Sequence, residues 1–248
     1  MSLKHRSMAS LPATTYEIYA TLPAQIAVQI GKAIVEDEFE PGRKLREGDL
    51  AAAFGVSRAS VREALRMVER EGLVTILPQR GALVTTLSAQ EVQDIFEIRA
   101  NLMGLACQRL ATAASRECRG RLDELLKDLR RARDDGDTYA RASLAISEYC
   151  VRNAGSSRLA DLILSFGRQT ARYTKLSLST PVRRRQSYAN WRELVAAMND
   201  GKPALAERVA RELVLNTRDT ALKMLANAKR SSAPGDESRP QAGKHPGR

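Results

Sequence analysis

The chain of 248 residues has few of the side chains that proteins use for acid–base, redox or metal chemistry. It has two histidines, His5 and His245, both near the ends, and three cysteines, Cys107, Cys118 and Cys150, which form no C-x-x-C pair. An odd number of widely spaced cysteines argues against a disulfide framework, and we expect all three to be buried in helices. No P-loop, G-x-G-x-x-G or G-x-S-x-G motif is present, which argues against an enzyme.

Long apolar runs are missing as well. No stretch approaches 18 consecutive apolar residues, so no transmembrane helix is predicted, and the first 15 residues lack the apolar core of a signal peptide. A cytoplasmic location is therefore the expectation. Aromatic residues make up only 4% of a chain that is 43% hydrophobic, which favours helix packing over sheets.

Acidic residues are fewer than basic ones, with 29 Asp and Glu against 40 Lys and Arg. The chain carries a formal net charge of +11, which indicates a polyanionic partner. Nucleic acid is the first candidate for that partner and an anionic membrane surface the second. Net charge alone does not choose between them.

Residues 57–70 have the pattern of an amphipathic helix with two distinct faces. One face is an apolar stripe made of Val61, Ala64, Leu65 and Val68. The other is a basic ridge made of Arg58, Arg62, Arg66 and Arg70. Ser57 is a suitable N-cap. A short helix over 48–54 and a turn at Gly55-Val56 precede it, which predicts a helix-turn-helix that presents 57–70 to a DNA major groove. A basic ridge by itself is more often only a solvated face.

The flanking segments favour DNA binding. β-rich runs at 74–77 and 82–86 surround Pro78-Gln79-Arg80-Gly81 and predict a hairpin, and a hairpin directly after a recognition helix is a wing. Residues 45–47 read as a short strand or an extended link. A helix is predicted over 16–39, with its regular part starting near Leu22 because Pro23 interrupts the pattern.

Several motifs occur here in a fixed order. They are Phe39-Glu40-Pro41-Gly42-Arg43-Lys44-Leu45-Arg46-Glu47, Leu50-Ala51, Phe54-Gly55-Val56-Ser57-Arg58, Val61-Arg62-Glu63-Ala64-Leu65, Glu71-Gly72-Leu73-Val74 and Arg80-Gly81. Together they resemble the winged-helix domain of the GntR family of transcription regulators over about residues 20–86. The resemblance implies a DNA-binding domain.

The rest of the chain shows helical periodicity only. A capping box formed by Ser88 and Glu91 starts the first of these helices. Helices are predicted at 89–114, 116–134, 137–152, 156–178, 182–199 and 203–228. Short connections imply antiparallel neighbours and therefore a bundle.

The predicted fold is thus mainly α. It comprises an N-terminal winged helix-turn-helix with a small β-hairpin wing over 16–86 and an antiparallel all-α bundle of six or seven helices over 87–228. Disordered ends are expected at 1–15 and 229–248, because the latter is rich in Gly, Pro, Ser and charge.

The order and lengths of the bundle helices resemble the FCD ligand-binding domain of the FadR branch of the GntR family. The supporting residues are Phe96-Glu97-Ile98-Arg99, Gly155, Leu159, Ala197-Met198 and Asp200-Gly201. Many members hold a metal with an Asp and a His at i and i+4 and two later His. Those positions fall on Ser143, Ser147, Trp191 and Leu213 here, so we expect no metal and no cofactor. A site rebuilt from the three cysteines is a minor alternative.

Arg99 lies where members of this branch often keep an arginine, and a buried guanidinium can grip a carboxylate. We therefore predict a pocket for a small organic acid that is lined by Arg99, Ser143, Ser147, Trp191 and Leu213. The alternatives are a surface or salt-bridged Arg99, a Trp191 that only packs in the core, and no ligand at all. Arg183-Arg184-Arg185 is more readily a solvated helix N-terminus than a nucleic-acid contact.

For DNA, we expect Arg58 and Arg62 to read base edges and nearby phosphates. The remaining predicted contacts are Ser57 and Ser60 with phosphate, Ala59 with a thymine methyl, Arg46 with the flanking backbone, and Arg80 and Gly81 with the minor groove. Some relatives have a basic residue in place of Gly48, so one contact is missing here.

The predicted function is a homodimeric regulator that binds a palindromic double-stranded DNA operator under the control of a small-molecule effector. The main alternative is a ligand-independent regulator whose bundle serves only dimerisation. An enzyme and a membrane-binding protein are weaker alternatives.

Overall fold

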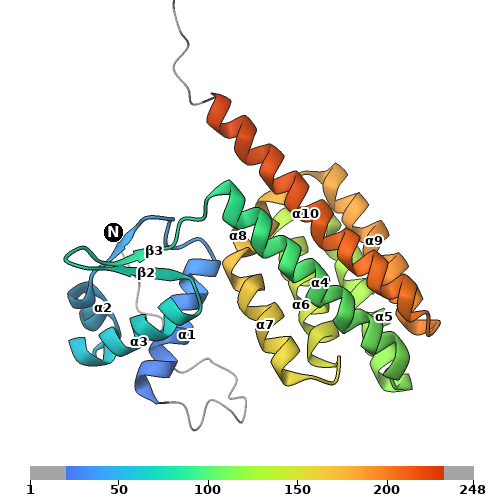
Figure 1. Ribbon diagram of the computed structural model, residues 1–248, viewed down its shortest axis with the longest axis horizontal. Coiled ribbons are helices and arrows are strands. Elements are labelled where there is room, and N and C mark those ends of the chain that lie inside the picture. Colours follow the sequence, from blue (N-terminus) through green and yellow to red (C-terminus); the bar gives the residue numbers. More distant parts are fainter. Residues whose placement is uncertain (1–20, 232–248) are drawn as a thin grey trace, which may run out of the picture.

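The computed structural model describes residues 21–231 and has a winged helix-turn-helix beside a helical bundle (Figure 1). The first part consists of α1 Leu22–Val35, β1 Lys44–Leu45, α2 Glu47–Phe54, α3 Arg58–Arg70, β2 Val74–Leu77 and β3 Gly81–Val84. Its antiparallel sheet has the order β1-β3-β2. The predicted fold class, including the small wing, is confirmed. Of the predicted disordered ends, 1–15 and 229–248, the first and residues 232–248 of the second lie outside the described residues.

Helix α1 ends earlier than the pattern suggested, and positions 16–20 of the predicted helix lie outside the described residues. The side chain of Thr21 accepts a hydrogen bond from the Ala24 amide at 3.4 Å, and Pro23 follows in the first turn, where its missing N–H is harmless. The helix ends at Val35 and not at Phe39, since Asp37 takes a left-handed conformation with φ 62°. This early end turns Asp37 toward the bundle.

The winged part has its own hydrophobic core. Ile26 and Ile30 of α1 are buried in it with Val61 and Leu65 of α3 and Val74 of β2. The apolar stripe read from the sequence is therefore the inner face of α3, and its basic ridge faces outward. A side-chain bond also holds the wing to α3, because the carboxylate of Glu69 accepts the Ile76 amide at 2.9 Å.

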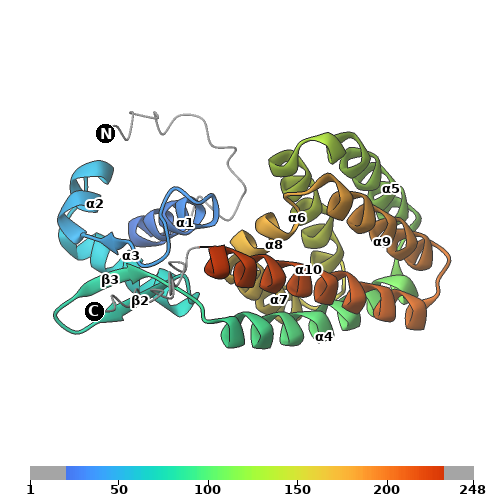
Figure 2. The ribbon, with the colours of Figure 1, turned by 90° about the horizontal axis from the view of Figure 1, so that it is seen from above.

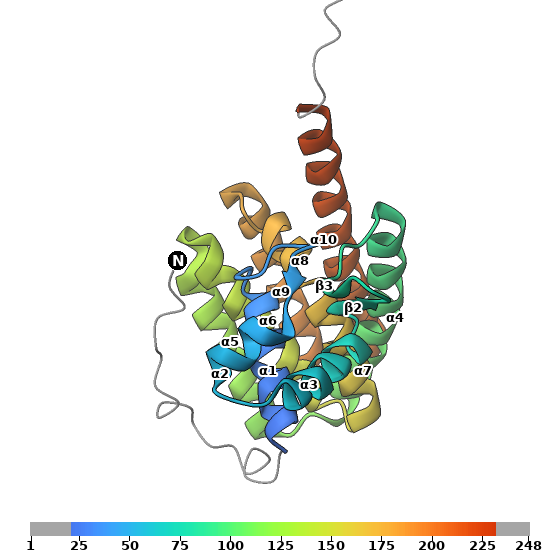
Figure 3. The ribbon, with the colours of Figure 1, turned by 90° about the vertical axis from the view of Figure 1, so that its left-hand side faces the viewer.

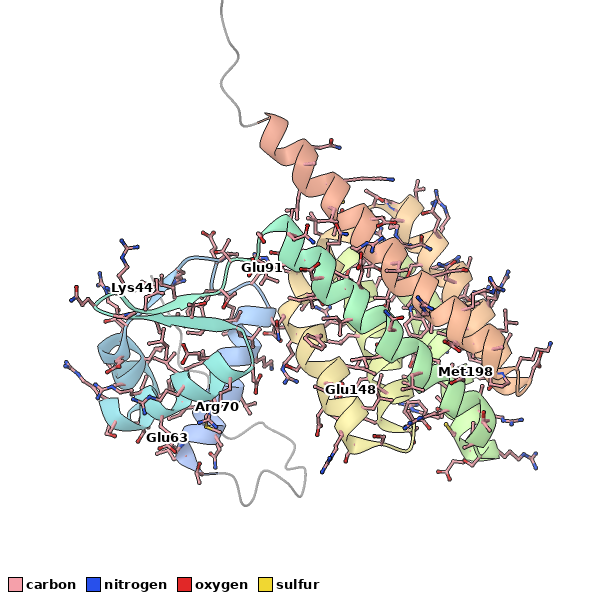
Figure 4. All side chains as sticks on the ribbon, viewed as in Figure 1. Lys44, Glu63, Arg70, Glu91, Glu148 and Met198 are labelled. Carbon is pink, nitrogen blue, oxygen red and sulfur yellow. The ribbon has the colours of Figure 1, made fainter. Side chains whose placement is uncertain are left out.

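The bundle follows directly and is wholly helical. Its elements are α4 Ala89–Ala113, α5 Arg116–Arg131, a 3-10 turn Ala132–Asp134, α6 Gly136–Arg152, α7 Ser157–Gln169, α8 Ala171–Ser177, α9 Pro181–Asn199 and α10 Pro203–Ser231. The predicted capping box at the start of α4 is confirmed. The Ser88 amide donates to Glu91 Oε2 at 2.7 Å, and these bonds to Ser88 lower the pKa of Glu91. Figure 4 labels Glu91 where the chain leaves the wing.

Two predicted helix boundaries were wrong. The expected single helix over 156–178 is two helices, because Thr170 interrupts it and donates its hydroxyl to the Phe166 carbonyl at 2.8 Å. Helix α10 continues through Ser231, beyond its expected end at 228. Part of the predicted disordered tail is therefore helical.

Helices α4 and α10 run antiparallel side by side (Figure 2), and three contacts fix their register. Arg218 pairs with Glu97 at 2.9 Å, and Gln108 donates to Glu207 at 3.0 Å. Between them, a Cβ on Gly104 would come within 2.8 Å of the Arg211 side chain, so glycine allows this close approach. Each step along α4 is therefore matched by one step back along α10.

The winged part contacts the bundle through α7 and α8, and it lies in front of the bundle in the view of Figure 3. Arg168 binds Glu71 at 3.0 Å and Arg172 binds Asp37 at 2.9 Å. Gly72 has φ 73°, a conformation that favours glycine, and a Cβ there would lie 2.8 Å from the end of the Gln169 side chain, which would have to move. The residues around the Thr170 break thus contact the winged part.

Candidate functional site

The turn between α2 and α3 has the geometry of a helix-turn-helix. Gly55 ends α2 in the left-handed conformation, with φ 66° and ψ 36°. Ser57 caps α3 as predicted, accepting the Ser60 amide at 3.1 Å, and the two serine hydroxyls lie 3.0 Å apart. Both hydroxyls therefore lie at the exposed start of α3, held by each other.

The outer face of α3 is basic and exposed. Arg58, Ala59, Arg62 and Arg66 are all exposed. The Arg62 guanidinium makes a two-point contact with Glu47, with Nε–Oε1 at 2.9 Å and Nη2–Oε2 at 2.8 Å. This contact lowers the pKa of Glu47. The sequence did not predict that Glu47 pairs with Arg62, because fifteen positions separate the two residues and no local pattern joins them.

Arg58 lies beside Gly48, the position at which some relatives have a basic residue. A Cβ on Gly48 would be 3.5 Å from Arg58 Nη2. A basic side chain at position 48 would bring a second positive charge to this guanidinium. In this chain, the Arg58 guanidinium lies beside the point from which such a side chain would start.

The wing presents the other predicted contacts. Strands β2 and β3 pair from Val74↔Val84 to Leu77↔Gly81, so a three-residue loop forms the tip. Arg80 and Gly81 are exposed there, and Arg46 is exposed just before α2. A Cβ on Gly81 would lie 3.9 Å from Lys44 Cε, so Lys44, which the sequence reading did not select, adds a cation beside the tip (Figure 4).

Arg99 is buried in the bundle, which contradicts the alternative of a surface side chain. Its Nη1 donates to the Thr170 hydroxyl at 3.3 Å, and its guanidinium lies 5.9 Å from the centre of the Phe96 ring. Its Nε is buried without a hydrogen-bond partner. Burial lowers the pKa of Arg99 to about 10.

The other four residues predicted to line a pocket are also buried in the bundle. Trp191 Nε1 donates to Ser143 Oγ at 3.2 Å, and the Ser147 hydroxyl lies 4.0 Å from Met103 Sδ. Leu213 belongs to the same core. Trp191 thus both packs in the core and makes a polar contact, as a large side chain with one N–H must when buried.

The basic triplet at the start of α9 is not the solvated cluster that we expected. Arg183 is 5% and Arg184 4% exposed, and only Arg185 is exposed. Arg184 donates to four backbone carbonyls, those of Arg133, Asp134, Leu178 and Ser179. It closes the ends of the 3-10 turn and of α8, which explains why it is buried without a carboxylate.

The predicted burial of the cysteines is confirmed, and Cys107, Cys118 and Cys150 are free thiols. Cys107 lies beside Cys150 and, together with burial, raises the pKa of that thiol. Within residues 21–231, no group of three or more His, Cys, Asp and Glu side chains is placed to hold a metal ion. Over the same range, no helix is long and apolar enough to cross a membrane.

A cavity of about 410 Å³ opens between the wing and α4. Glu69, Glu91, Asp94 and Gln169 contribute polar side chains to its lining. The three carboxylates make this cavity unsuitable for an organic acid.

Family models match both parts of the chain. The model described as bacterial regulatory proteins, gntR family, covers residues 22–84, and the FCD domain model covers residues 94–216. The chain belongs to the gntR family. It carries the FCD domain behind the family's DNA-binding domain, as the sequence reading expected.

Curated relatives of this gntR-family protein are regulators as well. An uncharacterised HTH-type transcriptional regulator, YdhC of Bacillus subtilis, is 35% identical over 108 residues, which are 44% of this chain and 48% of that protein. The gluconate operon transcriptional repressor of Bacillus licheniformis is 28% identical over 147 residues, covering 56% and 57% of the two chains. The chain thus spans about half the length of these relatives. Its family is one of transcription regulators and not of enzymes.

Solved structures show the same fold. Escherichia coli McbR/YncC superposes with a TM-score of 0.71 at 18% identity, over 86% of this chain and all of that one. A putative GntR regulator from Rhodococcus sp. RHA1 gives 0.64 at 22% identity, over 83% and 98%. At these identities the likeness concerns the fold of the gntR-family protein alone.

Proposed function

We propose that this gntR-family protein is a cytoplasmic homodimer that binds a palindromic DNA operator, with an affinity set by a small organic acid in the bundle. The observation that carries the proposal is the outer face of α3, where exposed arginines follow a capped turn. Guanidinium groups suit both guanine edges and phosphates. Ser57 and Ser60 at the start of α3 and Arg80 and Gly81 on the wing extend this surface.

A dimer follows from the size of the reading surface. One recognition helix covers only a half-site, and a two-fold operator needs a second helix about one DNA turn away. The bundle provides the helical surfaces on which two copies can associate. The spacing of the two α3 helices then depends on how each winged part is held by its bundle.

A route from the bundle to the DNA-binding part runs through Thr170. Arg99 donates to Thr170, and Thr170 separates α7 from α8. Arg168 and Arg172, two residues on either side, pair with Glu71 and Asp37 of the winged part. An acid that draws Arg99 away from Thr170 would therefore act next to the contacts that hold the winged part.

The experiment is a selection of bound duplexes from a random pool by the full chain, followed by titration of the selected site. A two-fold symmetric site with half-sites about one turn apart is expected. Recovery of no preferred sequence would overturn the proposal.

A ligand-independent regulator is the second candidate. The bond between Trp191 and Ser143 favours it, because these two side chains satisfy each other inside the core. If no organic acid changes the operator affinity, the ligand-independent regulator is supported over effector control.

A further inference from the structure

Arg183 shares with Arg99 an unusual environment for a charged side chain. Arg99 is 9% and Arg183 5% exposed, and the Nε atom of each is buried without a hydrogen-bond partner. Among residues 21–227, no carboxylate forms an ion pair with either one. A buried cation without a counter-charge is costly, so two of them call for an explanation.

The neighbouring Arg184 shows what a purely structural buried arginine looks like here. It spreads its donors over four backbone carbonyls. Arg183 instead makes one long bond, from Nη2 to the Thr217 hydroxyl at 3.4 Å. Burial lowers the pKa of Arg183, as it does for Arg99.

The register of α4 and α10 places the two guanidiniums in the same layer of the bundle. Glu97 is level with Arg218, and Gly104, seven residues on, is level with Arg211, seven residues back. By this register Arg99 is level with position 216, next to Thr217. The hydroxyl that Arg183 reaches is therefore at the height of Arg99.

Helix α8 supplies hydroxyl groups near this layer. Thr174 and Ser177 of α8, and Thr170 at the N-cap position before it, are spaced by four and three residues and so lie on one side of α8. Thr170 accepts from Arg99, whereas Thr174 Oγ1 and Ser177 Oγ are buried without partners. Since α8 packs against α10, these hydroxyls lie on the side of α8 that faces the bundle interior.

We propose that Arg183 is a second anion-binding residue and that the effector is a small dicarboxylate, with one acid group held by Arg99 and the other by Arg183. This inference rests on the proposed effector control. It deepens that proposal, because a single arginine would accept any monocarboxylate, whereas two in one layer select for a second acid group. The hydroxyls of α8 suit a polar body between the two groups.

The test compares acids of equal length that differ in one carboxylate: malonate, succinate and glutarate against propionate, butyrate and valerate. Binding to the full chain is followed by the emission of Trp191, the one tryptophan of the sequence, and by thermal shift. At least one dicarboxylate should bind about tenfold or more tightly than its monocarboxylate partner. Equal binding of both series, or binding of neither, would overturn the inference.

Variants assign the second acid group to its residue. Arg183→Met should reduce dicarboxylate binding to the monocarboxylate level, while the matched change at the exposed neighbour, Arg185→Met, should leave the preference intact. Because methionine replaces an unpaired buried charge, the melting temperature of Arg183→Met without acid should stay the same or rise. If that variant does not fold, Arg183→Lys keeps the charge without the planar fork and should still weaken the preference.

A preference that survives Arg183→Met or Arg183→Lys would contradict the assignment. Operator binding by the wild-type chain is measured in parallel, with and without the acid. Its absence under both conditions would defeat the proposed regulator, whereas the carboxylate preference alone decides the inference about Arg183.

Discussion

The arginines along α3 of the winged part and three buried arginines of the bundle have opposite surroundings. In the winged part, Arg58, Arg62 and Arg66 stand in water along α3. In the bundle, Arg99, Arg183 and Arg184 are withdrawn from it. An exposed guanidinium costs little to keep and is free to meet a polyanion, whereas a buried one must be satisfied by the protein or by a ligand. The same residue type therefore forms the proposed DNA surface in the winged part, and in the bundle it serves structure or the proposed ligand binding.

The largest expected effect tests the structural arginine of the bundle. Arg184→Ala should leave the carbonyls at the ends of α8 and the 3-10 turn without their charged donor and lower the free energy of unfolding by about 3–5 kcal/mol. Denaturant titration of the full chain measures it. Arg185→Ala, one position along and exposed, is the control and should change stability little. Equal stability of the two variants would break the contrast between buried and exposed arginines.

The next effect tests the exposed arginines. Arg62→Ala should weaken operator binding roughly 5- to 150-fold and relax its sequence preference, with little change in stability. Fluorescence anisotropy with the selected operator and with a scrambled duplex measures both. Arg131→Ala removes an equally exposed arginine from the bundle and should not change operator binding. If both variants lost similar operator affinity, α3 would contribute to binding only through its net charge.

The smallest effect concerns the partner of Arg62. Its guanidinium lowers the pKa of Glu47, so Glu47 is ionised at pH 7, and the contribution of this pair is present above the ordinary carboxylate pKa and is lost as pH falls below it. Glu47→Gln removes this negative charge and should strengthen binding to a scrambled duplex a few-fold at pH 7. The ratio of operator affinity to scrambled-duplex affinity should therefore fall. The variant and wild type should become alike as the pH falls through the range in which Glu47 takes up its proton. A scrambled-duplex affinity that falls in the variant would show that Glu47 aids binding.

The sequence predicts features whose causes are local. Ser57 and Ser88 cap their helices because the donors they serve lie three residues away, and the apolar stripe of α3 follows helical spacing. The Arg62–Glu47 contact, the burial of Arg184 and the break at Thr170 escape such a reading. Arg184 is buried by backbone carbonyls, two of them about fifty positions upstream, and carbonyls leave no pattern in the residue types. The DNA-contact and effector residues remain predictions, although the structure places the former at the surface and the latter in the core.

The two parts of the molecule are joined by ion pairs, Arg168 with Glu71 and Arg172 with Asp37, whose side chains are about one-third to two-fifths exposed. Added salt weakens partly exposed pairs of this kind, just as it weakens contacts between cations and DNA phosphates. If the chain binds DNA as proposed, ionic strength acts twice on it, by competing for the duplex and by weakening the ion pairs between the bundle and the winged part. A plot of operator affinity against salt concentration would then differ in slope from the value that the number of neutralised phosphates alone requires, and neutralising Asp37 and Glu71 together would bring the slope back toward that value.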